Sequence, residues 1–202
     1  GNPRIQNGTV DMGAFEGGKT SYTVEFRLDD GLIHLGGGNV QQTIARGEGA
    51  QEPVVAAVAG WTFNGWSASF QRITNALTVE SRTSAAPSDW TVLIHRGPLT
   101  NDATWAAGIV HVVVGTFTVA NGVTLTIEPD AVVKFCPGAA LETISGIILA
   151  NGATLTHLYD DDAGGDTLND GGTRIPVVGQ YSLVQVFTDA ATTIRYYASS
   201  EV

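Results

Sequence analysis

Apolar and polar residues alternate along several short segments in the first half of the chain. Residues 22–28 read Tyr-Thr-Val-Glu-Phe-Arg-Leu, the period of two that is typical of a half-buried strand. The turn residues 29–31, Asp-Asp-Gly, follow directly, so a hairpin is expected there. Residues 47–58 are rich in Ala and Val and are expected to form a short helix or an irregular connection. Further strands are predicted at residues 40–44, 61–63, 66–70 and 77–80.

The second half of the chain contains an internal repeat. Residues 119–127, VANGVTLTI, recur 30 residues later as residues 149–157, LANGATLTH, and six of the nine positions are identical. Residues 109–114 are apolar at nearly every position, which indicates a strand that is buried on both faces. Short repeated strands separated by turn residues favour a solenoid, in which each coil buries its inward side chains against the next. Strands at residues 181–187 and 192–197 would continue or cap it.

These patterns divide the chain into four parts of an all-β protein. Residues 1–19 contain one strand, Thr9 to Phe15, and residues 20–83 form a small module. Residues 84–89, Ser-Ala-Ala-Pro-Ser-Asp, are expected to be a linker. Residues 90–202 form the start of a solenoid, with an acidic loop at residues 160–172 and the terminal strands. The strand at Thr9 is too small to be stable alone, so we expect it to add to another sheet of this chain or of a neighbour.

Composition narrows the classes of partner. Only 15% of the residues are charged, 43% are apolar, and the formal net charge is −10. Nucleic acid and anionic lipid need a positive protein surface, so both are excluded as main partners. No apolar run is long enough to insert into a membrane. Cys136 is the only cysteine, which rules out an internal disulfide, and its place before a Pro-Gly turn indicates a small packed residue rather than a reactive thiol.

A motif in the module resembles a known family. Residues 60–66, GWTFNGW, follow the strand at residue 22 by about 38 residues and precede the strand at residue 77 by about 10. This arrangement is similar to the Listeria–Bacteroides or internalin B-repeat family, small β-grasp-like modules strung along bacterial surface proteins. The resemblance covers residues 21–83. It departs at residues 50–57, AQEPVVAA, which replace an Asp-Pro-rich loop.

A second resemblance covers residues 90–173. Residues 122–135, GVTLTIEPDAVVKF, are similar to the opening coils of right-handed parallel β-helices in large bacterial surface proteins. Residues 7–16, NGTVDMGAFE, resemble the closing strand of such a helix. The two resemblances imply a β-grasp-like module followed by a short right-handed β-solenoid, located outside the cell or on its surface.

Two sets of residues are candidate binding sites. Asp160, Asp162, Asp166 and Asp170 lie within the acidic loop and could supply oxygen ligands to Ca²⁺, the one cofactor that the sequence suggests. Leu168 interrupts the alternation of ligands, so a solvated acidic loop is the other interpretation. The side chains of Trp61 and Trp66 are expected in the core of the module, and a sugar-stacking platform is the alternative.

No catalytic arrangement is evident. A polysaccharide-active β-helix would need a carboxylate pair, or a calcium site with a base, aligned along several coils. Here the carboxylates at residues 160–162 share one loop, and Arg174 follows without coil spacing. The four histidines, His34, His95, His111 and His157, are scattered without metal-site spacing, and His111 is expected to be a hydrogen-bonded strand residue.

The sequence therefore predicts a structural or interaction segment without catalysis. It would act as a spacer, a stalk or a head-to-tail fibre subunit of a secreted bacterial surface protein. In the fibre version, an assembly strand containing Thr9, Val10, Met12 and Phe15 completes the open solenoid edge of a neighbouring copy. The alternative is an adhesin module that binds a glycan or a host surface protein through an exposed tryptophan, Trp61, Trp66, Trp90 or Trp105.

Overall fold

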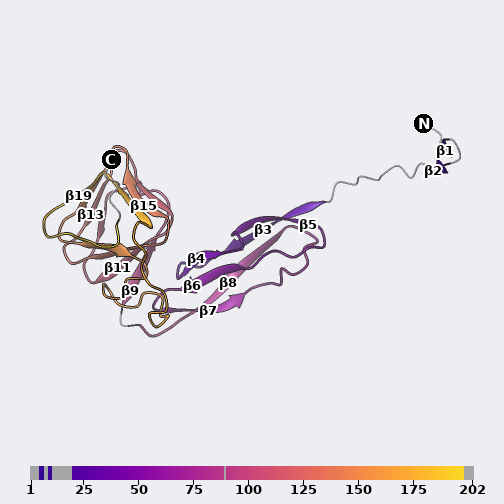
Figure 1. Cartoon of the computed structure of the whole chain (residues 1–202), viewed down its shortest axis with the longest axis horizontal. Helices are drawn as coiled ribbons and strands as arrows, with labels where there is room; N and C mark the ends of the chain where they lie inside the picture. The colour runs from indigo at the N-terminus through magenta and orange to yellow at the C-terminus, as the bar shows by residue number, and fades with distance from the viewer. Residues whose placement is uncertain (1–4, 7–8, 11–19, 89, 198–202) are drawn as a thin grey trace.

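The protein is all-β, as predicted. A computed structural model describes residues 5–6, 9–10, 20–88 and 90–197, and none of these residues is helical. Figure 1 shows an elongated module of strands β3 to β8 beside a stack of short strands that starts at β9. No described helix is therefore available to span a membrane.

The module contains two sheets. The larger sheet has the order β5-β3-β8-β7, and its first and last strands in sequence, β3 and β8, pair in parallel. The smaller sheet is an antiparallel pair, β4 and β6. The strands are β3 (Ser21–Arg27), β4 (Leu32–Gly37), β5 (Gln41–Ala45), β6 (Pro53–Ala57), β7 (Trp61–Trp66) and β8 (Leu77–Ala85).

Three local predictions for the module are wrong. The hairpin expected after residue 28 does not form, because β4 pairs with β6 while β3 pairs with β5 and β8. Residues 47–58 contain β6 rather than a helix. Residues 67–70 bend away from β7, which places Phe70 in the module core. In addition, Ala85 pairs with Trp61, so β8 continues through residues 84 and 85 of the expected linker.

The module core is built around Phe26. Its ring makes edge contacts with Trp66 and Phe70, each with 5.0 Å between ring centroids. Ile73 and Val79 are also buried in this cluster. Edge-to-face aromatic pairs of this kind stabilise a small core beyond their buried area.

The second part is a three-sided stack of parallel strands, here called the solenoid. Its sheets have the orders β10-β13-β16-β19, β20-β17-β14-β11-β9 and β12-β15-β18, and every pairing between these strands is parallel. The strands are β9 (Thr91–His95), β10 (Ala103–Trp105), β11 (Ile109–Val113), β12 (Thr116–Val119), β13 (Thr124–Ile127), β14 (Val132–Phe135), β15 (Ala139–Thr143), β16 (Ile147–Ala150), β17 (Thr154–His157), β18 (Tyr181–Val184), β19 (Val186–Thr188) and β20 (Thr193–Ile194).

One coil of the solenoid is shorter than the sequence repeat. Leu125 pairs with Ala103 on one side and with Ile148 on the other, so successive coils are offset by 22 and 23 residues. The 30-residue repeat instead relates the β12–β13 corner to the β16–β17 corner. The same Asn-Gly turn therefore serves two different corners, with Gly122 and Gly152 both at positive φ.

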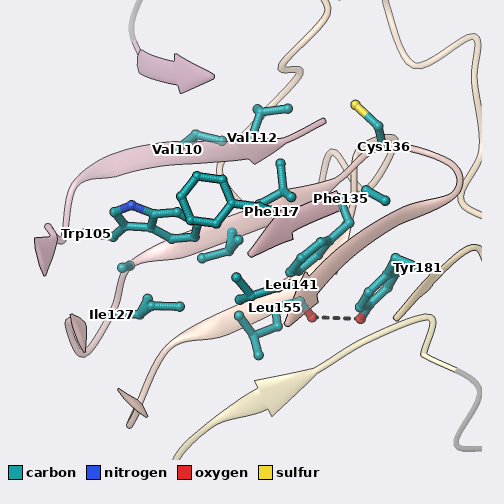
Figure 2. Packing of buried hydrophobic residues seen from close by; sticks show 14 of the residues in the cluster. Trp105, Val110, Val112, Phe117, Ile127, Phe135, Cys136, Leu141, Leu155 and Tyr181 are labelled. Carbon is teal, nitrogen blue, oxygen red and sulfur yellow. Dashed lines mark hydrogen bonds between the residues drawn. The ribbon is translucent and has the colours of Figure 1, made fainter. Parts of the chain in front are cut away.

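The solenoid interior is packed with apolar side chains (Figure 2). Phe135 stacks on Tyr181 with 4.5 Å between ring centroids, and the Tyr181 hydroxyl donates a hydrogen bond to the carbonyl oxygen of Leu155. Cys136 is buried at the edge of this core, and burial raises the pKa of its thiol to about 12. This environment confirms the prediction of a packed, unreactive cysteine.

The N-terminal strand pairs locally. β1 (Ile5–Gln6) and β2 (Thr9–Val10) form an antiparallel pair that is separate from the other sheets. The expectation that Thr9 and Val10 would extend the module or the solenoid of the same chain is therefore wrong, because among the described strands they pair only with β1. The other two residues of the predicted assembly strand, Met12 and Phe15, lie outside the described residues.

Candidate functional site

The acidic loop (residues 160–172) packs against the protein, so the interpretation of these residues as a solvated loop is wrong. It lies between β17 and β18, and Asp160, Ala163, Thr167 and Leu168 are all buried. Leu168 belongs to the same hydrophobic cluster as the solenoid core. The apolar residue that interrupts the calcium pattern, Leu168, therefore serves to pack the loop against the solenoid core.

Buried polar contacts attach the acidic loop to the solenoid. Lys134 in β14 donates a hydrogen bond from Nζ to the carbonyl oxygen of Gly165, at 2.7 Å. The carboxylate of Asp160 accepts a hydrogen bond from Oγ1 of Thr156 at 2.6 Å and pairs with Arg195 at 2.9 Å. Burial lowers the pKa of Lys134 to about 8, although the neighbouring carboxylates, Asp161 first, oppose this shift. Two buried charged side chains, those of Lys134 and Asp160, thus attach the loop to the solenoid.

The acidic loop and the solenoid also contact the module. The backbone N–H of Ala59 donates to the carbonyl oxygen of Thr167 at 2.7 Å. Arg96, which follows β9, donates to the carbonyl oxygen of Leu32. Ile33 and Val58 of the module are buried in the cluster that contains the solenoid core. The two parts therefore share one hydrophobic interface, reinforced by hydrogen bonds to main-chain carbonyl oxygens.

A pocket of about 240 Å³ lies where these parts meet, and we call it the junction pocket. Two tryptophans flank it, Trp61 from the module and Trp90 from the start of the solenoid, with exposed fractions of 41% and 46%. The acidic loop contributes Asp166 and Asn169. The remaining lining residues are Ala59, Gly60, Ala86, Pro87 and Ser88.

Glycine backbones hold both tryptophan rings in place. A Cβ atom on Gly31 would overlap the indole of Trp61, and one on Gly165 would overlap the indole of Trp90. Each ring therefore lies directly against main chain on one side. Ser88 fixes the backbone of Trp90 further, since its hydroxyl accepts from the N–H and donates to the carbonyl of that residue. The two exposed rings are consequently pre-organised.

The structure separates the two tryptophans that the sequence singled out. Trp66 packs in the module core, and its indole N–H donates to the carboxylate of Glu52 at 2.9 Å. Trp61 instead lines the junction pocket. Trp90 was one of four tryptophans named for the glycan-binding alternative, but neither its place beside Trp61 in one pocket nor the position of Asn169 was predicted. Their roles depend on how the acidic loop folds back, which no local pattern indicates.

The carboxylates that converge are not the set proposed for calcium. Asp166 and Asp170 each place an oxygen within 4.8 Å of the others in a group completed by Asp161. Asp160 is bonded to Thr156 and Arg195, and Asp162 is exposed outside this group. Burial and the charge of Asp166 raise the pKa of Asp161.

One of the three clustered aspartates, Asp170, already has a positively charged partner. Asp170 pairs with Arg174 at 2.7 Å and accepts hydrogen bonds from two backbone N–H groups. Asp166 accepts from the N–H of Gly171 through Oδ2, while its buried Oδ1 has no hydrogen-bond partner among the residues that the structure describes. The three carboxylates fit Ca²⁺ by ligand type, and with one converging oxygen each they supply three of the six to eight oxygens that it takes.

Two histidines that are 16 residues apart form a pair at the first coil. Nε2 of His111 lies 3.1 Å from the carbonyl oxygen of Ala106 and must carry a hydrogen, so Nδ1 of His111 accepts from Nε2 of His95 at 2.9 Å. His95 also stacks on Trp105. Burial lowers the pKa of both imidazoles, that of His95 to about 4. His111 is thus a hydrogen-bonded strand residue, as predicted.

In comparisons with known proteins, no family model, no curated protein and no solved structure matches the chain.

Proposed function

We propose that this chain is a structural segment of a secreted bacterial surface protein, acting as a spacer, stalk or head-to-tail fibre subunit without catalysis. The observation that carries the proposal is the shared interface between module and solenoid. Ile33 and Val58 lie in the solenoid cluster, and the acidic loop contacts both parts through Thr167 and Gly165. A junction fixed in this way holds two neighbouring modules at a constant angle, and a stiff stalk requires such fixed angles between its modules. The resemblances to surface-protein repeats agree with this role.

The last coil supplies the surface for assembly in the fibre version of the proposal. β18, β19 and β20 each stand at the end of a sheet, and no described strand pairs with their outer edges. Phe187 and Ile194 on these strands are 59% and 40% exposed. Unpaired strand edges offer main-chain hydrogen bonds to an added strand. We propose that the partner is a second copy of this chain, which contributes the segment around Thr9.

Removal of residues 1–16 tests the assembly step. We expect the full chain to show a light-scattering mass above the 21.1 kDa of one copy. The shortened chain should remain folded by circular dichroism and return to the mass of a single copy. Unchanged assembly after the deletion, or no assembly of either protein, would show that the proposed strand exchange is wrong.

A second experiment blocks the receiving edge. Lysine on an edge strand opposes strand addition, so Phe187→Lys and Ile194→Lys should each reduce assembly. Ile144→Lys is the matched control, because Ile144 is 84% exposed and lies outside the strands. Equal assembly of all three variants would contradict a role for the β18–β20 edge.

A further inference from the structure

We propose that the junction pocket binds a neutral saccharide, with the rings of Trp61 and Trp90 against sugar C–H faces and with Asp166 and Asn169 bonded to its hydroxyl groups. This inference does not depend on assembly. It assigns a ligand to a site that exists only because the module, the solenoid and the acidic loop meet.

The two tryptophans supply the apolar part of recognition. Each ring is covered on one side by a glycine backbone, Gly31 or Gly165, and each keeps more than two fifths of its surface exposed. An immobilised indole loses little entropy when a ligand stacks on it, which favours binding. Tryptophan presents a large apolar face beside a polar N–H, and this combination suits the mixed C–H and O–H surface of a pyranose ring.

Polar groups at the pocket match hydroxyl donors. Asp166 lines the pocket, and a carboxylate accepts hydrogen bonds from hydroxyl donors. Asn169 is exposed, and its side-chain amide supplies a donor and an acceptor. A hydroxyl-rich ligand satisfies both kinds of group at once.

Charge selects among saccharides. Asp166 has carboxylate oxygens of Asp161 and Asp170 within 4.8 Å, and the chain has a net charge of −10. Uronic acids and sulfated sugars would meet this negative potential at close range, so a neutral sugar is favoured. The pocket volume, about 240 Å³, is below the ~300–1,000 Å³ of sites for drug-sized ligands. It therefore suits one sugar ring, such as the end of a glycan.

A quaternary ammonium ion is the competing ligand chemistry, because aromatic faces beside a carboxylate also bind cations. Such a cage surrounds the cation with aromatic rings. Here only two of the nine lining residues are aromatic, and the pocket also presents Ser88, Asp166 and Asn169. These polar side chains favour hydroxyl groups over methyl groups.

The test is a glycan array that contains neutral, uronic-acid and sulfated glycans, followed by titration of the best neutral glycan with tryptophan fluorescence as the readout. Trp61→Ala and Trp90→Ala should each weaken binding about tenfold, the loss of one stacking contact. Asp166→Asn should also weaken it, whereas Asp162→Asn is the matched control, since Asp162 is an exposed acid of the same loop that does not line the pocket. Unchanged far-ultraviolet circular dichroism and a cooperative urea transition must accompany each loss.

Trp90→Phe and Asn169→Gly replace any variant that fails to fold, because phenylalanine keeps an aromatic ring and glycine tolerates the positive φ of residue 169. The proposal is overturned if no neutral glycan binds or if binding survives both tryptophan substitutions. It is also overturned if tetramethylammonium displaces the glycan or binds in its place, since the pocket would then be a cation cage. None of these outcomes depends on whether the chain forms fibres.

Discussion

The ammonium group of Lys134 lies 2.7 Å from the carbonyl oxygen of Gly165, and the same glycine supports the indole ring of Trp90. Lys134 is fully buried in β14, so a charge in the solenoid wall fixes the part of the acidic loop that forms the junction pocket. This contact links the stability of the loop to the geometry of the pocket.

The pKa of Lys134 gives a prediction for alkaline pH. Burial lowers this pKa from 10.5 to about 8, so between these values the unfolded chain binds more protons than the folded chain. The contribution of Lys134 to the free energy of unfolding must therefore increase as the pH rises from 8 toward 10, by about 2 kcal/mol. Urea unfolding of the wild type and of Lys134→Met across this range measures the difference.

The Lys134→Met variant is needed because the titration of Cys136 changes the free energy of unfolding in the opposite direction over the same pH range. Burial raises the pKa of Cys136 from 9.0 to about 12, which lowers stability as the pH rises through this range in both proteins. Subtraction of the Lys134→Met curve removes this common contribution. Parallel curves for the two proteins would contradict the assignment to Lys134.

The His95–His111 pair predicts a loss of stability in acid. Burial lowers the pKa of His95 from 6.5 to about 4, so the unfolded chain takes up a proton that the folded chain does not. Acidification from about pH 7 to about pH 4.5 should reduce the free energy of unfolding by about 2 kcal/mol through this residue. His95→Phe keeps a ring against Trp105 and should lack this part of the loss.

His34→Gln is the control for that measurement, because His34 lies in β4, outside the solenoid. The His95–His111 pair is intact in this variant, so the part of the acid loss assigned to His95 should remain. If His95→Phe loses as much stability in acid as the wild type does, another group is responsible.

The fold class was predictable from local patterns, whereas the site was not. Alternation over residues 22–28 predicted β3, because a half-buried strand imposes a period of two. The 30-residue repeat predicted stacked strands but not the length of one coil, which is 22 residues. The repeated Asn-Gly pair indicates a turn, but it does not indicate at which corner of the coil that turn lies. Which corner a turn serves depends on packing between coils.

The acidic loop shows the same limit more strongly. Four aspartates in sequence indicated solvent or calcium, yet Asp160 is buried by Thr156 and Arg195, which come from β17 and from beyond β20. The sequence of the loop alone does not indicate that Arg195, 35 residues away, pairs with Asp160. The convergence of Trp61 and Trp90 was hidden for the same reason.

Calcium binding stays a prediction of the sequence, and the structure identifies where to test it. Ca²⁺ at about 5 mM should raise the melting temperature by relieving repulsion among Asp161, Asp166 and Asp170, and a chelator should reverse the rise. Asp166→Asn should abolish this response, and Asp162→Asn should retain it. No response in the wild type, or an equal response in both variants, would rule out this carboxylate group as the site.

The contact between Gly31 and Trp61 gives a test of pre-organisation at the junction pocket. A methyl group at residue 31 would overlap the indole ring, so Gly31→Ala should destabilise the chain by about 1–3 kcal/mol, the usual cost of overpacking. In the Trp61→Ala background the overlap is absent, and the same substitution should cost less. Urea unfolding of the two single variants and the double variant gives the coupling energy. The double variant should lose less stability than the sum of the two single losses. Additive costs would mean that the Trp61 ring does not rest on Gly31 in solution, and the pocket would then lack one of its fixed walls.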